Sequence, residues 1–217
     1  MAKLYFRYGA MGCGKTMQLL QVAFNYEERG HQVCVMKPKT DTKNGEKLLT
    51  RIGPERVTDF CFEKGDDLFE ILKKFVKKKK ISCVLVDEAQ FLTTKQVDQL
   101  MKVTTDFDIP VMAYGLRLNF RLTDGGFEGA TRLLQMAHDI DEIKTICECG
   151  RKATLNARFL NGEFMADGPD VLIDDGTSEI EYRAICPKCY AEYAAGKRKG
   201  GMIQKNMLQE PSNANCD

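Results

Sequence analysis

Residues 9–16 read GAMGCGKT and match the phosphate-binding pattern G-x-x-x-x-G-K-[ST], which works between a β-strand and an α-helix. The preceding residues 4–8 (LYFRY) are rich in strand-forming aromatic side chains, and residues 16–29 carry apolar side chains at roughly helical spacing. The glycines let the loop curl so that its backbone N–H groups and the helix N-terminus face an anion. The stretch therefore predicts an α/β fold whose phosphate loop (P-loop) binds a nucleoside triphosphate.

A second landmark is the acidic pair Asp87 and Glu88, which directly follows the apolar run 81–86 (ISCVLV). Such a run predicts a central strand buried on both faces. Because parallel strands end at the same edge of a sheet, we expect Asp87 beside the P-loop, where it and Thr16 would hold Mg²⁺. Glu88 would accept a proton from an attacking hydroxyl or water, and Lys15 would reach the outer phosphates. The alternative is that the two acids only cap the following helix.

Strand-like and helix-like segments alternate as far as residue 116, which is typical of a parallel sheet covered by helices. The strands are expected at 4–8, 31–37, 81–86 and 109–116, and the helices at 16–29, 67–80 and 94–105. Lysines 77–80 suit a helix C-terminus, where the dipole favours positive charge, although they could also form a phosphate or nucleic-acid site.

Composition sets few limits on function. A chain of 217 residues can bury a substantial core, and its net charge of +1 argues against a surface dedicated to nucleic acid or membrane. The apolar runs are strand-sized and the N-terminus lacks a signal-peptide pattern, so we expect a cytoplasmic protein without a spanning helix. Its nine cysteines are then better explained as thiols or metal ligands than as disulfides.

Four of the cysteines form two close pairs, Cys147 with Cys149 and Cys186 with Cys189. Four thiolates can enclose Zn²⁺ tetrahedrally and join two hairpins that have little apolar surface of their own. Because all four positions would be filled by protein, such a zinc would be structural. The alternative is four reduced, unrelated cysteines, since the Cys-x-Cys spacing is tighter than the usual Cys-x-x-Cys.

The P-loop, the DEAQF motif at 87–91, the GLRLNFR motif at 115–121 and the paired cysteines occur in an order that resembles the cytosolic type of thymidine kinase found in bacteria and animals. The resemblance covers roughly residues 3–193. It implies transfer of the γ-phosphate of ATP to the 5′-hydroxyl of thymidine, with Mg²⁺ as the catalytic ion, a structural zinc, Glu88 as general base, tetramers, and inhibition by thymidine triphosphate.

The resemblance also assigns binding residues. Those for the nucleotide are Gly9, Ala10, Met11, Gly12, Cys13, Gly14, Lys15, Thr16, Asp87, Glu88, Ala89 and Gln90. Those for the substrate are Phe91, Leu116, Phe120, Phe127 and Tyr182 around the base, and Arg51 near the phosphates. The base's polar edge would be bound by the backbone of a lasso-like loop within 164–182, which is longer and more acidic here than is common. Taken singly and without the resemblance, each of these phenylalanines is better explained as a core residue.

Three parts are therefore expected: a P-loop kinase domain at 1–143, a zinc-binding, β-rich lasso domain at 144–193 and a mobile tail at 194–217. One rival function is a P-loop ATPase or nucleotide switch, in which Glu88 positions water and the zinc module binds a macromolecular partner. Another is a kinase for a different nucleoside, such as deoxyuridine or deoxycytidine. The weak basicity counts against DNA as the partner.

Overall fold

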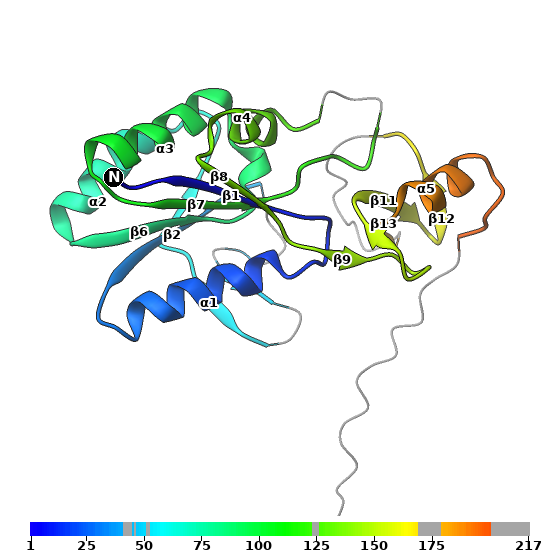
Figure 1. The fold of residues 1–217 in the computed structure, drawn as a ribbon, viewed down its shortest axis with the longest axis horizontal. Coiled ribbons are helices and arrows are strands. Elements are labelled where there is room, and N and C mark those ends of the chain that lie inside the picture. Colours follow the sequence, from blue (N-terminus) through cyan, green and yellow to red (C-terminus); the bar gives the residue numbers. More distant parts are fainter. Residues whose placement is uncertain (41–44, 46, 51–52, 123–125, 169–178, 201–217) are drawn as a thin grey trace, which may run out of the picture.

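The computed structural model describes residues 1–40, 45, 47–50, 53–122, 126–168 and 179–200 (Figure 1). Its main feature is a six-stranded sheet in which every neighbouring pair is parallel, in the order β5-β2-β6-β7-β1-β8. The strands are β1 (Leu4–Tyr8), β2 (Gln32–Pro38), β5 (Phe60–Phe62), β6 (Ile81–Val86), β7 (Val111–Gly115) and β8 (Asp139–Glu142). The predicted α/β parallel-sheet fold is confirmed.

Helices cover both faces of this sheet (Figure 1). One face packs against α1 (Lys15–Glu27) through a core that includes Leu19, Leu20 and Ala23. The other packs against α2 (Leu68–Lys78), α3 (Thr94–Asp106) and α4 (Glu128–Met136). The central strand β6 is buried along nearly its whole length, as its apolar run predicts.

Local sequence explains where the helices begin and end. The side chain of Asp67 accepts the Glu70 N–H and caps α2, while Thr93 and Gln96 form a capping box on α3. The first helix stops at Glu27, two residues before the expected end, and Gly30 follows with a left-handed φ of 76°. The strand expected at 109–116 is β7, which starts only at Val111 because Pro110, just before it, has no N–H to donate to the sheet.

A smaller module follows the large sheet. It contains β9 (Thr145–Ile146) paired with β10 (Lys152–Ala153), the three-stranded antiparallel sheet β12-β11-β13, and α5 (Pro187–Ala194). The strands of that sheet are β11 (Leu155–Leu160), β12 (Glu163–Met165) and β13 (Ile180–Ile185). Its small core is an aromatic cluster in which Phe159, Phe164, Tyr190 and Tyr193 contact one another edge-on or stacked.

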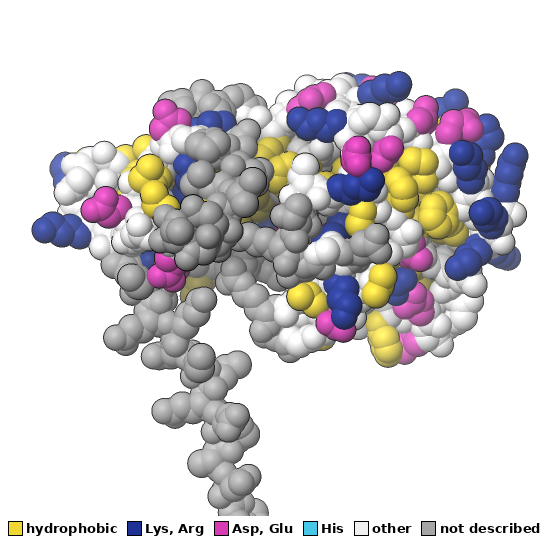
Figure 2. Space-filling view, turned by 180° about the vertical axis from the view of Figure 1, so that it is seen from behind, with side chains coloured by type: hydrophobic (Ala, Val, Ile, Leu, Met, Phe, Trp, Pro, Cys, Tyr) yellow, Lys and Arg dark blue, Asp and Glu magenta, His cyan; other side chains and the backbone are white. Residues whose placement is uncertain are grey.

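Two short elements complete the described fold, the hairpin of β3 (Lys47–Leu49) with β4 (Glu55–Val57) and the single 3₁₀ turn η2 (Ala89–Phe91). Figure 2 shows lysine and arginine side chains gathered at the end of the large domain away from the module, with acidic side chains between them. The lysines at 77–80, at the end of α2, are exposed. Within the described ranges, none of the helices is long and apolar enough to cross a membrane.

Candidate active site

The P-loop lies between the end of β1 and the start of α1, where the sequence requires glycine for two different reasons. Gly12 and Gly14 have φ angles of 73° and 88°, which L side chains rarely adopt. A Cβ on Gly9 would lie 2.5 Å from the carbonyl oxygen of Ile143, so this glycine permits the close approach of the chain that follows β8. The loop thus curls back to the start of α1, and the N-terminus of that helix favours an anion.

Lys15 lies over this loop. Its side chain is largely buried, and its Nζ donates to the carbonyl oxygens of Gly9 at 3.3 Å and Ala10 at 3.1 Å. A bound phosphate would supply the full negative charge that two carbonyl dipoles provide only in part. The predicted role of Lys15 as a phosphate ligand is compatible with this position.

The P-loop and the end of β6 meet through Thr16 and Asp87, as the shared edge of the sheet requires. The Thr16 hydroxyl donates to Asp87 Oδ2 at 2.9 Å, and Asp87 is only 2% exposed. Burial, and after it the negative charge of Glu88, raises the pKa of Asp87 to about 7. A hydroxyl and a carboxylate at this distance are oxygen donors of the kind that Mg²⁺ prefers, so the pair fits the predicted ion.

Glu88 is held in an unusual conformation. Its φ is 47°, in the left-handed region, which turns its side chain out of the line of the strand. Gln90 Nε2 donates to Glu88 Oε2 at 2.5 Å, and Gln90 Oε1 accepts the Leu116 N–H at 3.0 Å. Gln90 is 3% exposed, and a Cβ on Gly115 would lie 2.9 Å from its Oε1. Gln90 therefore links the carboxylate of Glu88 to the end of β7.

The apolar residues predicted to surround a base form two aromatic pairs. Phe91 and Phe127 meet edge-on with ring centroids 5.6 Å apart, and Phe120 and Tyr182 meet edge-on at 6.3 Å. Leu116 lies at the end of β7, 9% exposed. Phe120 is nearly fully buried, whereas Phe91, Phe127 and Tyr182 are half-buried. Arg51 and residues 169–178 of the expected lasso loop lie outside the described residues.

The small module contacts the P-loop region directly. A cavity of about 250 Å³ lies between Met11 and Gly12 on one side and Tyr182, Glu148 and Tyr193 on the other. A second contact between the module and the large domain involves the buried Arg158, whose guanidinium lies 3.8 Å from the centroid of the Phe120 ring. Arg158 also donates to the Asp167 carbonyl oxygen at 2.7 Å.

The predicted metal ligands converge. The Sγ atoms of Cys147, Cys149, Cys186 and Cys189 all lie within 4.8 Å of one another, with Cys149 and Cys186 at 3.6 Å. Four sulfurs held about 2.3 Å from one Zn²⁺ ion would lie roughly 3.8 Å apart, so the cluster is close to the geometry that this ion requires. The donor set is entirely soft sulfur, which suits zinc and excludes magnesium or calcium.

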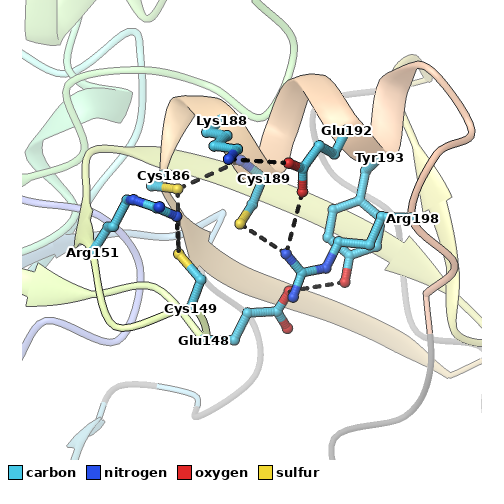
Figure 3. Close-up of polar contacts among 9 residues, drawn as sticks. All are labelled: Glu148, Cys149, Arg151, Cys186, Lys188, Cys189, Glu192, Tyr193 and Arg198. Atoms are coloured by element: carbon cyan, nitrogen blue, oxygen red, sulfur yellow. Dashed lines mark hydrogen bonds and ion pairs between the residues drawn. The ribbon is translucent and has the colours of Figure 1, made fainter.

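Basic side chains surround this cluster (Figure 3). Arg198 Nη1 donates to Cys189 Sγ at 2.9 Å, and Arg151 Nη1 lies 3.6 Å from Cys149 Sγ. Glu148 accepts from the Tyr193 hydroxyl at 2.9 Å and pairs with Arg198 Nη2 at 3.0 Å. The backbone N–H of Arg151 lowers the pKa of Cys149 to about 6. The cluster thus combines four sulfurs with positive charge that would offset the excess negative charge of a tetrathiolate site.

Sequence reasoning identified the P-loop, the acidic pair and the four cysteines, but it did not identify Asn156 or Arg158 as contacts of the site. Both lie in β11, whose odd positions Leu155, Ala157 and Phe159 belong to the module core. Polar residues at alternate positions of an otherwise apolar strand were the available signal. Such a pattern normally indicates a solvent-facing side, but here that side faces the large domain.

A P-loop with a threonine–aspartate pair and a positioned carboxylate defines a protein of the P-loop class that acts on nucleoside triphosphates. The thymidine kinase family profile matches residues 2–190, and the chain belongs to that family. It is 42% identical over 196 residues to the thymidine kinase of Francisella tularensis subsp. holarctica, over 88% of this chain and 98% of that protein. The predicted resemblance is therefore confirmed.

Other relatives agree. The chain is 44% identical over 200 residues to the thymidine kinase of Legionella pneumophila (strain Paris), over 91% of this chain and 93% of that protein. It is 41% identical over 194 residues to the thymidine kinase of Enterobacteria phage T4, over 88% of this chain and 97% of that protein. Among solved structures, an ATPase domain matches 87% of this chain and 82% of its own with 14% identity and a TM-score of 0.47. This similarity is too low to inform function.

Proposed function

We propose that the chain is an ATP:thymidine 5′-phosphotransferase, which makes thymidine monophosphate and ADP in the salvage of DNA precursors. Family membership and the thymidine kinases that match nearly its whole length support this activity. The structural observation that carries it is the Glu88 carboxylate, held by Gln90 beside the P-loop and next to the Thr16–Asp87 pair. The macromolecular ATPase alternative is not favoured by these relatives.

In this mechanism the backbone of 9–16 and Lys15 would hold the donor phosphates, while Thr16 and Asp87 would hold Mg²⁺. When bound, Mg²⁺ would neutralise charge on the phosphate oxygens. Glu88 takes the proton from the 5′-hydroxyl, and its bond from Gln90 fixes the direction in which the carboxylate points. Phosphoryl transfer needs little covalent help, so these residues act mainly by alignment.

Recognition of the nucleoside is assigned to the aromatic pairs. Phe91 with Phe127, and Phe120 with Tyr182, would present apolar faces and edges to a flat pyrimidine, and Leu116 would close the pocket at the sheet edge. The lasso backbone within 164–182 would bind the base's polar edge, and Arg51 would lie near the phosphates.

The four-cysteine cluster is proposed to hold one structural Zn²⁺ per chain, in a lasso domain at 144–193 that follows the kinase domain at 1–143. The last strand of the large sheet ends at Glu142 and β9 begins at Thr145, which supports that boundary. A cytoplasmic homotetramer inhibited by thymidine triphosphate is proposed from the family alone.

The decisive experiment incubates the purified protein with ATP and Mg²⁺ and each deoxynucleoside separately, and measures the 5′-monophosphate formed. Product from thymidine and deoxyuridine, but not from deoxycytidine or purine nucleosides, is expected. ATP consumption with no phosphorylated nucleoside would refute the proposed function and turn attention to a macromolecular partner.

Glu88→Gln tests the general base. Gln can still accept the bond from Gln90, so the fold is preserved while the proton acceptor is lost. We expect kcat to fall roughly a hundredfold or more, with ATP binding unchanged. Glu70→Gln, on the exposed face of α2, serves as the matched control. Nearly full turnover by Glu88→Gln would remove Glu88 from this role.

A further inference from the structure

Asn156 occupies the face of β11 that is turned away from the module core. The odd positions of the strand, Leu155, Ala157 and Phe159, lie in that core, so alternation places Asn156 and Arg158 on the opposite face. Arg158 on this face contacts Phe120 of the large domain. Asn156 is only 3% exposed, so a polar side chain is buried where the two parts of the molecule meet.

Both ends of the Asn156 amide are used. Its Oδ1 accepts the N–H of Met11, in the P-loop, at 2.8 Å. Its Nδ2 donates to the carbonyl oxygen of Leu118 at 2.9 Å. A backbone N–H can only donate and a carbonyl oxygen can only accept, so the two partners themselves determine which way the amide points.

The two partners belong to opposite halves of the proposed reaction. Met11 lies in the loop that would hold the phosphate donor, four residues before Lys15. Leu118 lies two residues from both Leu116 and Phe120, which are proposed to surround the acceptor nucleoside. One short, buried side chain therefore joins the donor loop to the acceptor pocket.

From this geometry, and resting on the proposed function, we infer that Asn156 is a positioning residue that sets the distance between the P-loop and the nucleoside pocket. In-line phosphoryl transfer depends on this distance, because acceptor and donor must approach within about 3–3.5 Å. The Met11 N–H is directed to Asn156 in place of a phosphate, so Asn156 anchors the start of the loop. The residue touches neither reactant in this role.

Two variants test whether Asn156 sets the distance between the P-loop and the nucleoside pocket or only supplies hydrogen bonds to buried backbone groups. Asn156→Ala removes both bonds but leaves room for water. Asn156→Gln keeps the amide and lengthens the side chain by one methylene. Tyr190→Phe is the matched control: the Tyr190 hydroxyl donates to the Phe120 carbonyl oxygen at 3.0 Å, so this change breaks a buried bond from the module to the same pocket segment and leaves the P-loop contact intact.

The assay measures kcat for thymidine phosphorylation, the Kd of ATP and of thymidine by calorimetry, zinc content and thermal unfolding. For both Asn156 variants we expect kcat to fall by about tenfold or more, because small misplacements of reacting groups slow transfer steeply. Both Kd values should stay within about threefold of wild type. Zinc content should not change, and Tyr190→Phe should keep kcat within about threefold.

Three results would overturn the inference. The first is an unchanged kcat in both Asn156 variants, and the second is a fall in kcat in Tyr190→Phe as large as that in Asn156→Ala. The third is loss of cooperative unfolding in both Asn156 variants, which would make the residue purely structural. The wild-type reaction is measured first. A wild-type protein that phosphorylates no thymidine refutes the proposed function and this inference with it. If the wild type is active, the three results above refute the inference alone.

Discussion

Asp87→Asn is expected to stabilise the nucleotide-free protein near neutral pH while it removes Mg²⁺-dependent activity. Asp87 is 2% exposed, and burial, followed by the charge of Glu88, raises its pKa from 3.8 to about 7. Because the pKa in the fold lies above that in the unfolded chain, folding favours the protonated carboxyl. Its contribution to stability is complete below pH 3.8 and is lost as the pH rises to about 7.

The magnitude follows from these two pKa values. A factor of ten in proton affinity is about 1.4 kcal/mol, so the carboxylate opposes folding by about 2 kcal/mol at about pH 5 and about 4 kcal/mol at about pH 8. Asn can preserve the local bonds: its oxygen still accepts the Glu88 N–H, and the Thr16 hydroxyl can turn to accept from its amide. The gain on substitution should therefore approach the full electrostatic penalty.

The assay is thermal or urea unfolding of wild type and Asp87→Asn between about pH 5 and pH 8, without nucleotide, magnesium or a chelator that would remove zinc. The advantage of the variant should grow by about 2–3 kcal/mol, or roughly 5–10 °C in Tm for a chain of this size. In a Glu88→Gln background the gain should shrink, because the neighbouring charge is gone. Stability curves that stay parallel across this pH range would refute the reasoning.

Two other substitutions test packing and the metal site. A Cβ on Gly129 would overlap the Leu92 carbonyl oxygen, so Gly129→Ala should lower the free energy of unfolding in urea by about 2–3 kcal/mol, and a change below about 0.5 would contradict the packing. Arg198→Met removes the bond to Cys189 Sγ and should speed zinc release to a coloured chelator by about tenfold. Lys197→Met, at the neighbouring exposed position, is the control whose rate should not change. An unchanged rate in Arg198→Met would contradict the role given to Arg198.

The parallel sheet could be predicted because its information is local. The ISCVLV run of β6 is apolar at every position except Ser82, and strands buried on both faces have such runs. The glycine pattern at 9–16 fixes a strand before it and a helix after it. Strand order carries no comparable local signal, since β1 pairs with β7 and β8, more than a hundred residues later in the chain.

The candidate site likewise combines residues that local sequence predicts with contacts that it does not. Asp87, Glu88 and the cysteine pairs could be found by spacing, because their chemistry needs neighbours in the sequence. Gln90 was grouped with the nucleotide-binding residues, but its bond to Leu116 spans 26 residues, and the bond from Met11 to Asn156 spans 145. No periodicity or motif encodes a contact between such distant segments, so the partners of these two residues could only be seen in the fold.

Two features of the segment 87–90 oppose folding of the nucleotide-free protein. Glu88 adopts a left-handed φ of 47°, which opposes folding by about 1–2 kcal/mol for a residue with a Cβ, and Asp87 is buried with a raised pKa. Gln90, pinned between Glu88 and the Leu116 N–H, prevents this segment from relaxing. A bound cation would relieve the burial of the Asp87 charge, and a substrate hydroxyl would use the direction imposed on Glu88. The burial and the backbone conformation that destabilise the nucleotide-free protein therefore serve the binding of the proposed reactants.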